Sequence, residues 1–158
     1  MQKITTFLTY NGSAEKAVEL YTSVFRNSRI ITTTHYTEAG PEEPGSVMTI
    51  VFELEGQEFI ALNASGFSFA QGISLMVSCE TQEEVDDLWE KLSDGGEKGP
   101  CGWLTDRFGV SWQIVPRVLG ELISDPDREK AGRVMSAMLG MRKIEIHELE
   151  EAAEGVRA

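Results

Sequence analysis

The chain has 158 residues, of which 41% are hydrophobic and 25% charged, a composition typical of a globular protein with its own core. Its formal net charge is -12, from 26 acidic and 14 basic residues, and the basic residues form no run. Such a surface repels nucleic acids and anionic membranes, so we expect neither as a partner. We also expect no signal peptide and no membrane span, which makes the cytoplasm the predicted location.

The first part of the chain predicts one strand, one helix and three further strands. A strand is expected over residues 4–10, and an amphipathic helix over residues 13–25, where apolar side chains recur at helical spacing. Strand-like runs follow over residues 29–36, 47–54 and 58–63.

The same order of elements then repeats. A strand is expected over residues 73–79 and a second amphipathic helix over residues 81–92. At least two more strands follow, over residues 99–104 and 110–115. Residues 13–21 align with residues 81–89 without a gap, with hydroxyl on hydroxyl, acid on acid, leucine on leucine and aromatic on aromatic. The repeat predicts two βαβββ modules of an α+β protein, with each helix on one face of a sheet.

Residues 102–116 are the most informative segment. Two apolar runs flank an Asp106-Arg107-Phe108-Gly109 turn, in which Gly109 supplies the positive φ of a tight reversal, so we predict a β-hairpin that ends at Pro116. Strand alternation puts Trp112 and Gln113 on opposite faces, and we expect Trp112 to pack under a helix.

Beyond residue 117 the pattern becomes helical. A short turn region is expected at residues 118–123, a helix start at Asp125-Pro126-Asp127, and a last helix over residues 144–153, after which the final residues fray. The middle helix carries an apolar stripe formed by Ala131, Val134, Met135, Met138 and Leu139. We expect one domain over residues 1–158, with module one at about 1–65, module two at about 72–117 and a helical tail at 118–158.

The string from Trp103 to Gln113, the opening Ile4-Thr5-Thr6-Phe7-Leu8 and the tail Met135 to Met141 resemble the PhnB-like branch of the vicinal oxygen chelate superfamily. That superfamily includes glyoxalase I, the bleomycin-resistance proteins and extradiol dioxygenases. The resemblance implies a curved mixed sheet around a cleft, and paired subunits, hence a homodimer. Members often carry the label 3-demethylubiquinone-9 3-methyltransferase, but no Gly-rich loop of the nucleotide-binding type follows a strand here, so no cofactor is predicted.

The resemblance also implies positions for a divalent metal, one on each of four strands. They fall near Thr6, Ala61 or Asn63, Ile73 and Gln113, of which Gln113 alone is a usual ligand, so we predict no bound metal. By the resemblance and strand alternation, the expected ligand-binding cleft is lined by Thr6, Asn63, Ile73, Ser111, Gln113 and Val115. The expected pocket rim consists of Phe67, Phe69, Trp103 and Asp106.

Several readings stay open. Asp106 is either a general base or a residue that binds its own turn, and Cys101 is either a nucleophile or structural; the second reading is favoured for both. The favoured function is a small-molecule-binding protein of the glyoxalase/bleomycin-resistance type without an intact metal site. The alternatives are a metal-independent lyase, isomerase or transferase acting on a small apolar or aromatic metabolite, and an interaction module with a vestigial cleft.

Overall fold

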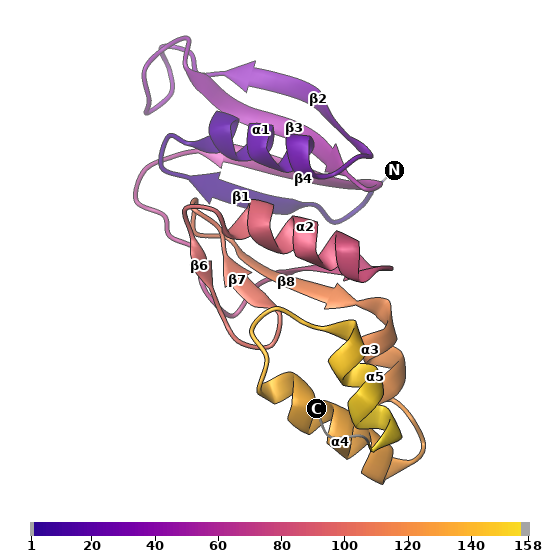
Figure 1. Ribbon diagram of the computed structural model, residues 1–158. Coiled ribbons are helices and arrows are strands. Elements are labelled where there is room, and N and C mark those ends of the chain that lie inside the picture. The colour runs from indigo at the N-terminus through magenta and orange to yellow at the C-terminus, as the bar shows by residue number, and fades with distance from the viewer. Residues whose placement is uncertain (1, 156–158) are drawn as a thin grey trace. The chain divides into compact units, whose positions relative to one another are not determined.

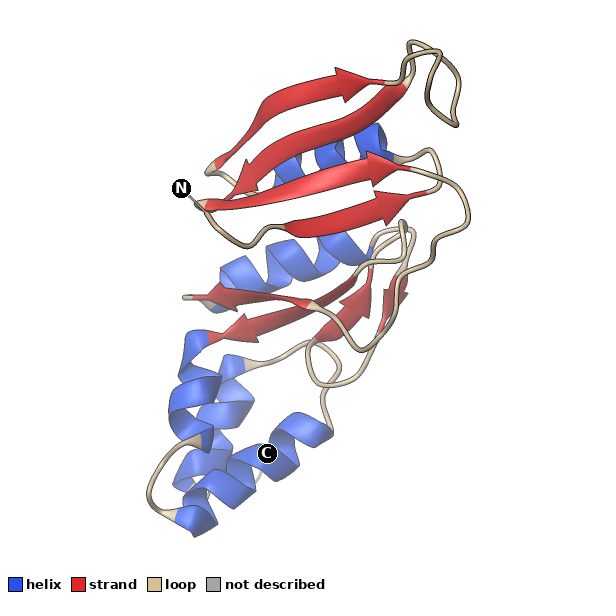
Figure 2. Cartoon of the chain, turned by 180° about the vertical axis from the view of Figure 1, so that it is seen from behind, coloured by secondary structure: helices blue, strands red, loops and turns tan. Residues whose placement is uncertain are grey.

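The computed structural model describes residues 2–155, so the predicted fraying of the last three residues lies outside the described part. The chain divides after Phe69 into two compact units. Figure 1 shows the elements in chain order, and Figure 2 shows the sheets from behind.

The first unit contains one helix and four strands: β1 (Thr6–Tyr10), α1 (Ala14–Val24), β2 (Ser28–His35), β3 (Val47–Leu54) and β4 (Gln57–Asn63). Its sheet has the order β1-β4-β3-β2, in which β1 and β4 are parallel and the other pairs antiparallel. One face of the sheet packs on α1, where the Tyr21 and Phe52 rings stack with centroids 6.3 Å apart.

The second unit opens with the same series: β5 (Leu75–Cys79), α2 (Gln82–Ser93), β6 (Glu97–Lys98), β7 (Trp103–Thr105) and β8 (Ser111–Pro116). Its sheet has the order β5-β8-β7-β6, with β5 and β8 parallel. Because the strand order and directions match those of the first sheet, the α+β class and the two βαβββ modules are confirmed, and the strands form two four-stranded mixed sheets.

The expected strand over residues 99–104 is confirmed only at Trp103 and Leu104, which belong to β7, and the residues before them form the end of a hairpin. The ladder between β6 and β7 closes at Lys98 and Leu104, and the chain reverses through Pro100, Cys101 and Gly102. Cys101 and Gly102 have φ values of 56° and 83°, which a strand cannot contain. A Pro-x-Gly sequence is a turn signal, and the strand prediction missed it.

Three helices follow β8: α3 (Arg117–Ile123), α4 (Arg128–Leu139) and α5 (Ile146–Glu154). The region expected as a short turn at 118–123 is therefore a helix. Together the three helices form a small core whose buried members are Leu119, Val134, Met141, Ile144, Leu149 and Ala153. In the predicted stripe of α4, Val134 is buried, whereas Met135 and Leu139 are 37% and 62% exposed.

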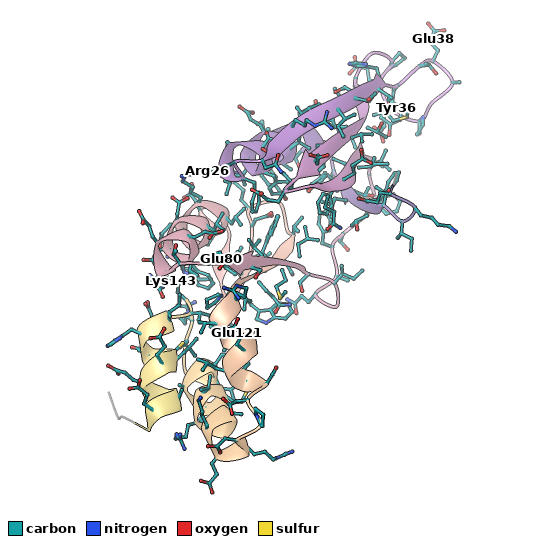
Figure 3. The ribbon with its side chains drawn as sticks, turned by 90° about the vertical axis from the view of Figure 1, so that its right-hand side faces the viewer. Arg26, Tyr36, Glu38, Glu80, Glu121 and Lys143 are labelled. Atoms are coloured by element: carbon teal, nitrogen blue, oxygen red, sulfur yellow. The ribbon has the colours of Figure 1, made fainter. Side chains whose placement is uncertain are left out.

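The tail helices join the second sheet at its β8 end. Arg117, the first residue of α3, pairs with Glu80 at 3.1 Å and with Glu121 at 2.7 Å; Figure 3 labels both acids. In the part of the chain that the structure describes, no helix is long and apolar enough to cross a bilayer.

Candidate functional site

Each sheet has one face turned toward its helix and one turned away, here called the distal face. On β8, Trp112 and Ile114 are 2% and 0% exposed and face α2, as alternation predicts. The distal face of the second sheet is formed by Met76 and Ser78 of β5, Trp103 and Thr105 of β7, and Ser111, Gln113 and Val115 of β8.

Asp106 holds the β7–β8 hairpin together. Its carboxylate accepts the backbone N–H groups of Phe108 at 2.8 Å and Val110 at 3.1 Å, and the indole N–H of Trp112 at 2.9 Å. The residue is 2% exposed. The predicted position of Asp106 on a pocket rim is therefore wrong, and the reading that it binds its own turn is confirmed.

A pocket of about 470 Å³ lies beside the β6–β7 hairpin of the second unit. Trp103, Thr105 and Ser111 of the distal face line it, and the hairpin turn from Lys98 to Cys101 forms one wall. Ser111 is 7% exposed, and among the described residues its hydroxyl has no hydrogen-bond partner. The pocket therefore combines an aromatic wall with a hydroxyl that is available to a ligand.

Gln113 lies next to this pocket. It is the cross-strand neighbour of Trp103, and its amide Nε2 donates to the Ser74 hydroxyl at 2.9 Å. Within residues 2–155 nothing donates a hydrogen bond to its Oε1. The bond from Nε2 thus orients the Gln113 side chain on the distal face, and Oε1 is available to accept a hydrogen bond from a ligand.

Val115 shares the distal face, but the tail helices cover it. It packs against their core, beside Leu119. The expectation that Val115 lines an open cleft is wrong for this chain, because α3 follows β8 directly and folds back over its end.

In the first unit, Asn63 anchors α1 and also lines a pocket of that unit, beside Tyr36 and Glu42. It is 8% exposed; its Oδ1 accepts the Ala14 backbone N–H at 2.9 Å, and its Nδ2 donates to Glu15 at 2.6 Å and to the Val47 carbonyl at 3.1 Å. These bonds replace the side-chain cap that Ser13 does not provide. The amide of Asn63 is committed to these bonds, and the ligand role predicted for Asn63 stays a prediction.

Thr6 lies on the same side of the first sheet as Asn63. It pairs with Phe59 on β4 and shares the face of Leu8, which is buried toward α1. The distal face of β1 instead carries Phe7, which is 54% exposed. The predicted cleft role of Thr6 is thus contradicted by the alternation of β1.

The three remaining predicted residues lie outside the strands. Ile73 precedes β5 and is 72% exposed, and Phe67 is 59% exposed. Phe69 belongs to the first unit and packs edge-to-face on Tyr10, with ring centroids 5.2 Å apart. Phe69 is therefore a packing residue of its own unit, and the ligand roles proposed for Ile73 and Phe67 stay predictions.

The model of the 3-demethylubiquinone-9 3-methyltransferase family matches residues 2–115. A putative 3-demethylubiquinone-9 3-methyltransferase, a PhnB protein from Bacillus cereus, is 41% identical; the match covers 73% of this chain and 99% of that one, with a TM-score of 0.66. This chain belongs to that family. None of the curated proteins matches it.

More distant structures share the fold of this family member. A protein from Pseudomonas aeruginosa is 19% identical over 73% of this chain and 98% of that chain, with a TM-score of 0.63. A fosfomycin resistance protein from Listeria monocytogenes, solved with Mn(II) and sulfate, is 15% identical over 72% of this chain and 92% of that chain, with a TM-score of 0.52. The fold is that of the vicinal oxygen chelate superfamily.

The superfamily implies a divalent metal, and the residues of this family member do not fit one. At the corresponding positions Thr6 and Asn63 face α1, and Ile73 has no donor atom. Gln113 supplies one neutral amide, whereas a catalytic site normally needs about three protein ligands. Among the described residues, no three His, Cys, Asp or Glu side chains gather into a group that could hold a metal ion.

The two cysteines differ in burial. Burial, together with the nearby Glu84, raises the pKa of the Cys79 thiol to about 12, so at neutral pH it is not a nucleophile. Cys101 is half-buried and lines the pocket, a position that the sequence reasoning missed along with that of Lys98. The turn signal Pro100-Cys101-Gly102 beside Trp103 was the clue that could have placed both.

Proposed function

We propose that this family member is a small-molecule-binding protein of the glyoxalase/bleomycin-resistance type that works without an intact metal site. Its ligand lies on the distal face of the second sheet, against Trp103 and within reach of Gln113. The observation that carries the proposal is the set of groups available there: an indole ring, the hydroxyl of Ser111 and one end of the Gln113 amide.

These groups favour an uncharged or aromatic ligand. A ligand ring on Trp103 gains burial and stacking. The Ser111 hydroxyl is open to solvent, since the described residues contain no buried side-chain N or O atom without a partner, and a ligand that hydrogen-bonds to Ser111 takes the place of a water.

Charge argues against an anionic ligand. The one cation among the pocket-lining residues, Lys98, pairs with Glu90 at 3.1 Å, and Glu97 lies in the same wall. An anion prefers an uncommitted Arg or Lys, and the net charge of -12 repels it further.

Tryptophan fluorescence tests the proposal with 2-naphthol, an uncharged aromatic probe. The chain has three tryptophans, of which Trp89 and Trp112 are 3% and 2% exposed, so a ligand in the pocket acts mainly on Trp103. We expect saturable quenching that Trp103→Phe largely removes. Gln113→Leu should weaken binding by about 1–3 kcal/mol, as for the loss of one polar partner.

The matched control is Gln57→Leu, the same substitution at an exposed position of the first unit. It should leave the affinity unchanged, and so should a chelator. Equal affinities for Gln113→Leu and Gln57→Leu would contradict the proposed site, and loss of binding with the chelator would contradict the metal-free mode.

A further inference from the structure

The hairpin turn in the pocket wall has an unfavourable backbone. The Trp103 N–H donates to the Pro100 carbonyl at 3.0 Å across Cys101 and Gly102, and both central residues have positive φ. This is the pattern of a type I′ turn, which favours Asn, Asp or Gly at both positions. Cys101 therefore adopts a left-handed conformation that its Cβ disfavours, and the turn needs support from outside.

That support comes from the tail. The turn's two central N–H groups donate to the tail backbone, Cys101 to the Met141 carbonyl at 2.8 Å and Gly102 to the Arg142 carbonyl at 2.7 Å. The Arg142 guanidinium in return donates to the Lys98 carbonyl at the other end of the turn. The approach is close, because a Cβ on Gly102 would lie only 3.0 Å from Ile144.

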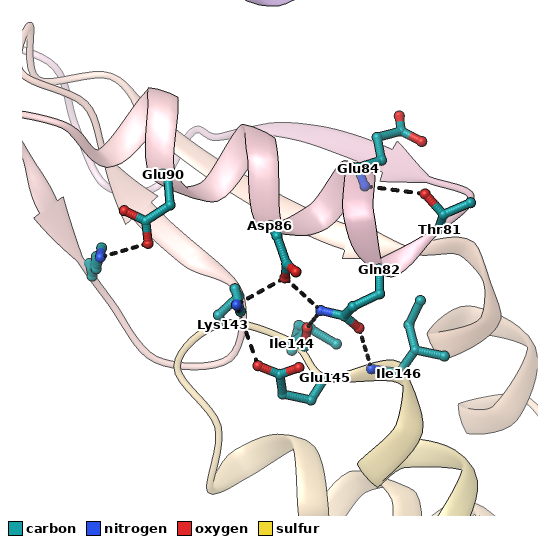
Figure 4. Close-up of polar contacts among 10 residues, drawn as sticks. Thr81, Gln82, Glu84, Asp86, Glu90, Lys143, Ile144, Glu145 and Ile146 are labelled. Carbon is teal, nitrogen blue, oxygen red and sulfur yellow. Dashed lines mark hydrogen bonds and ion pairs between the residues drawn. The ribbon is translucent and has the colours of Figure 1, made fainter.

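The same tail segment, residues 141–146, is held from its other side by α2; we call it the tail anchor. Gln82 of α2 donates to the Ile144 carbonyl at 2.9 Å and accepts the Ile146 N–H at 2.7 Å (Figure 4). Asp86, one turn further along α2, pairs with Lys143 at 2.9 Å. The tail anchor thus connects α2 to the turn.

This connection is an addition to the shared fold. The family model ends at residue 115, and the relative from Bacillus cereus is covered over 99% of its length by 73% of this chain. We propose that the tail anchor positions the Lys98–Gly102 turn, and so sets the shape of the pocket wall. Arg142 and Gln82 are positioning residues, because they act on the pocket through the turn.

Hydrogen exchange at the Cys101 and Gly102 amides tests this inference without a ligand. Arg142→Ala and Gln82→Ala should each speed exchange by about two- to tenfold, the effect of losing one or two hydrogen bonds. The emission of Trp103, which adjoins the turn, should shift with it. Arg142→Lys, which keeps a donor, should restore part of the protection.

Arg133→Ala is the matched control. Arg133 is also a tail arginine that binds carbonyls, those of Ala152 and Ala153 at 2.9 and 2.7 Å, but it does not contact the turn. It should leave exchange at the turn unchanged. Equal acceleration by Arg133→Ala, or no acceleration in both anchor variants, would overturn the inference.

The inference that the tail anchor positions the turn rests on the proposed function in one respect, that the pocket binds a ligand. The inference and the proposed function can therefore fail separately. In Arg142→Ala and Gln82→Ala, the affinity for 2-naphthol should fall, and it should fall further in the variant whose Cys101 and Gly102 amides exchange faster. If exchange rises and the wild type does not bind 2-naphthol, the anchor stands and the proposed function fails. If exchange rises while a measurable affinity stays constant, the turn does not shape the site, and the inference fails.

Discussion

At the scale of single residues, the alternation of side chains along a strand predicted which sheet face a residue occupies better than the family resemblance did. It placed Trp112 under α2 and Gln113 on the distal face, because the side chains of one strand obey a local rule. It could not predict that Asn63 anchors α1, because the partners of that amide, Ala14 and Val47, are distant in sequence. The resemblance likewise could not show that the Asn63 amide would bond to α1 and β3.

Asp106 offers a test at this scale. In Asp106→Asn the side-chain amide can still accept one or two turn bonds, but an N–H then faces the indole N–H of the buried Trp112. We expect a loss of about 1–3 kcal/mol in the free energy of unfolding, because a buried donor loses its partner. Urea denaturation measures it.

Asp87→Asn is the control for that experiment. Asp87 is an exposed acid of α2 that pairs with Lys91 one turn away, an interaction of about 0.5 kcal/mol or less. If both variants lose the same free energy of unfolding, the hydrogen bonds of the Asp106 carboxylate do not stabilise the β7–β8 hairpin as proposed.

At the scale of elements, the repeat predicted both modules, but the tail could be predicted only as helices. Its docking depends on residues that look ordinary in the sequence: Gln82 on an acidic helix, and Lys143 between two helices. Their partners are about 60 residues away along the chain, so no local sequence pattern predicts these contacts. The apolar stripe on α4 likewise did not show which of its residues the tail would bury: Val134 lies in the core of the three helices, whereas Leu139 is exposed.

The contact between Asp86 and Lys143 predicts a pH dependence for tail docking. Hydrogen bonds from Gln82 and Lys143 lower the pKa of Asp86 below its ordinary 3.8, and the bond to Asp86 raises the pKa of Lys143 above 10.5. The stabilisation is therefore present between about pH 4 and pH 10. It is lost as the pH falls through the pKa of Asp86 or rises through that of Lys143.

Asp86→Asn should accordingly lower stability at pH 7 by a few tenths of a kcal/mol, since the pair is partly exposed. The difference from wild type should shrink as the pH falls through the lowered pKa of Asp86, because the wild-type carboxylate then takes up a proton. Denaturant curves at pH 7 and at a series of acidic pH values measure this. A difference that stays constant over the whole series would show that the charge of Asp86 does not stabilise the docked tail.

At the scale of the whole molecule, the sequence predicted family and class because two modules repeat one pattern and one hairpin carries a distinctive string. The family model and the superfamily fold confirm both. The pocket could not be predicted in the same way. One of its walls is a turn that was expected to be part of a strand, and that turn bonds to a tail segment that lies beyond the family model. The homodimer expected from the resemblance stays a prediction.

The proposed site on the distal face of the second sheet, beside Trp103 and Gln113, should bind a small uncharged or aromatic molecule. A crystal structure of the protein soaked with 2-naphthol would show where such a molecule binds. We expect the naphthol ring against the indole of Trp103, with its hydroxyl hydrogen-bonded to Gln113 or Ser111 and no metal in contact. A ring bound elsewhere, such as the acidic pocket of the first unit beside Tyr36 and Glu42, with the Trp103 pocket empty, would contradict it.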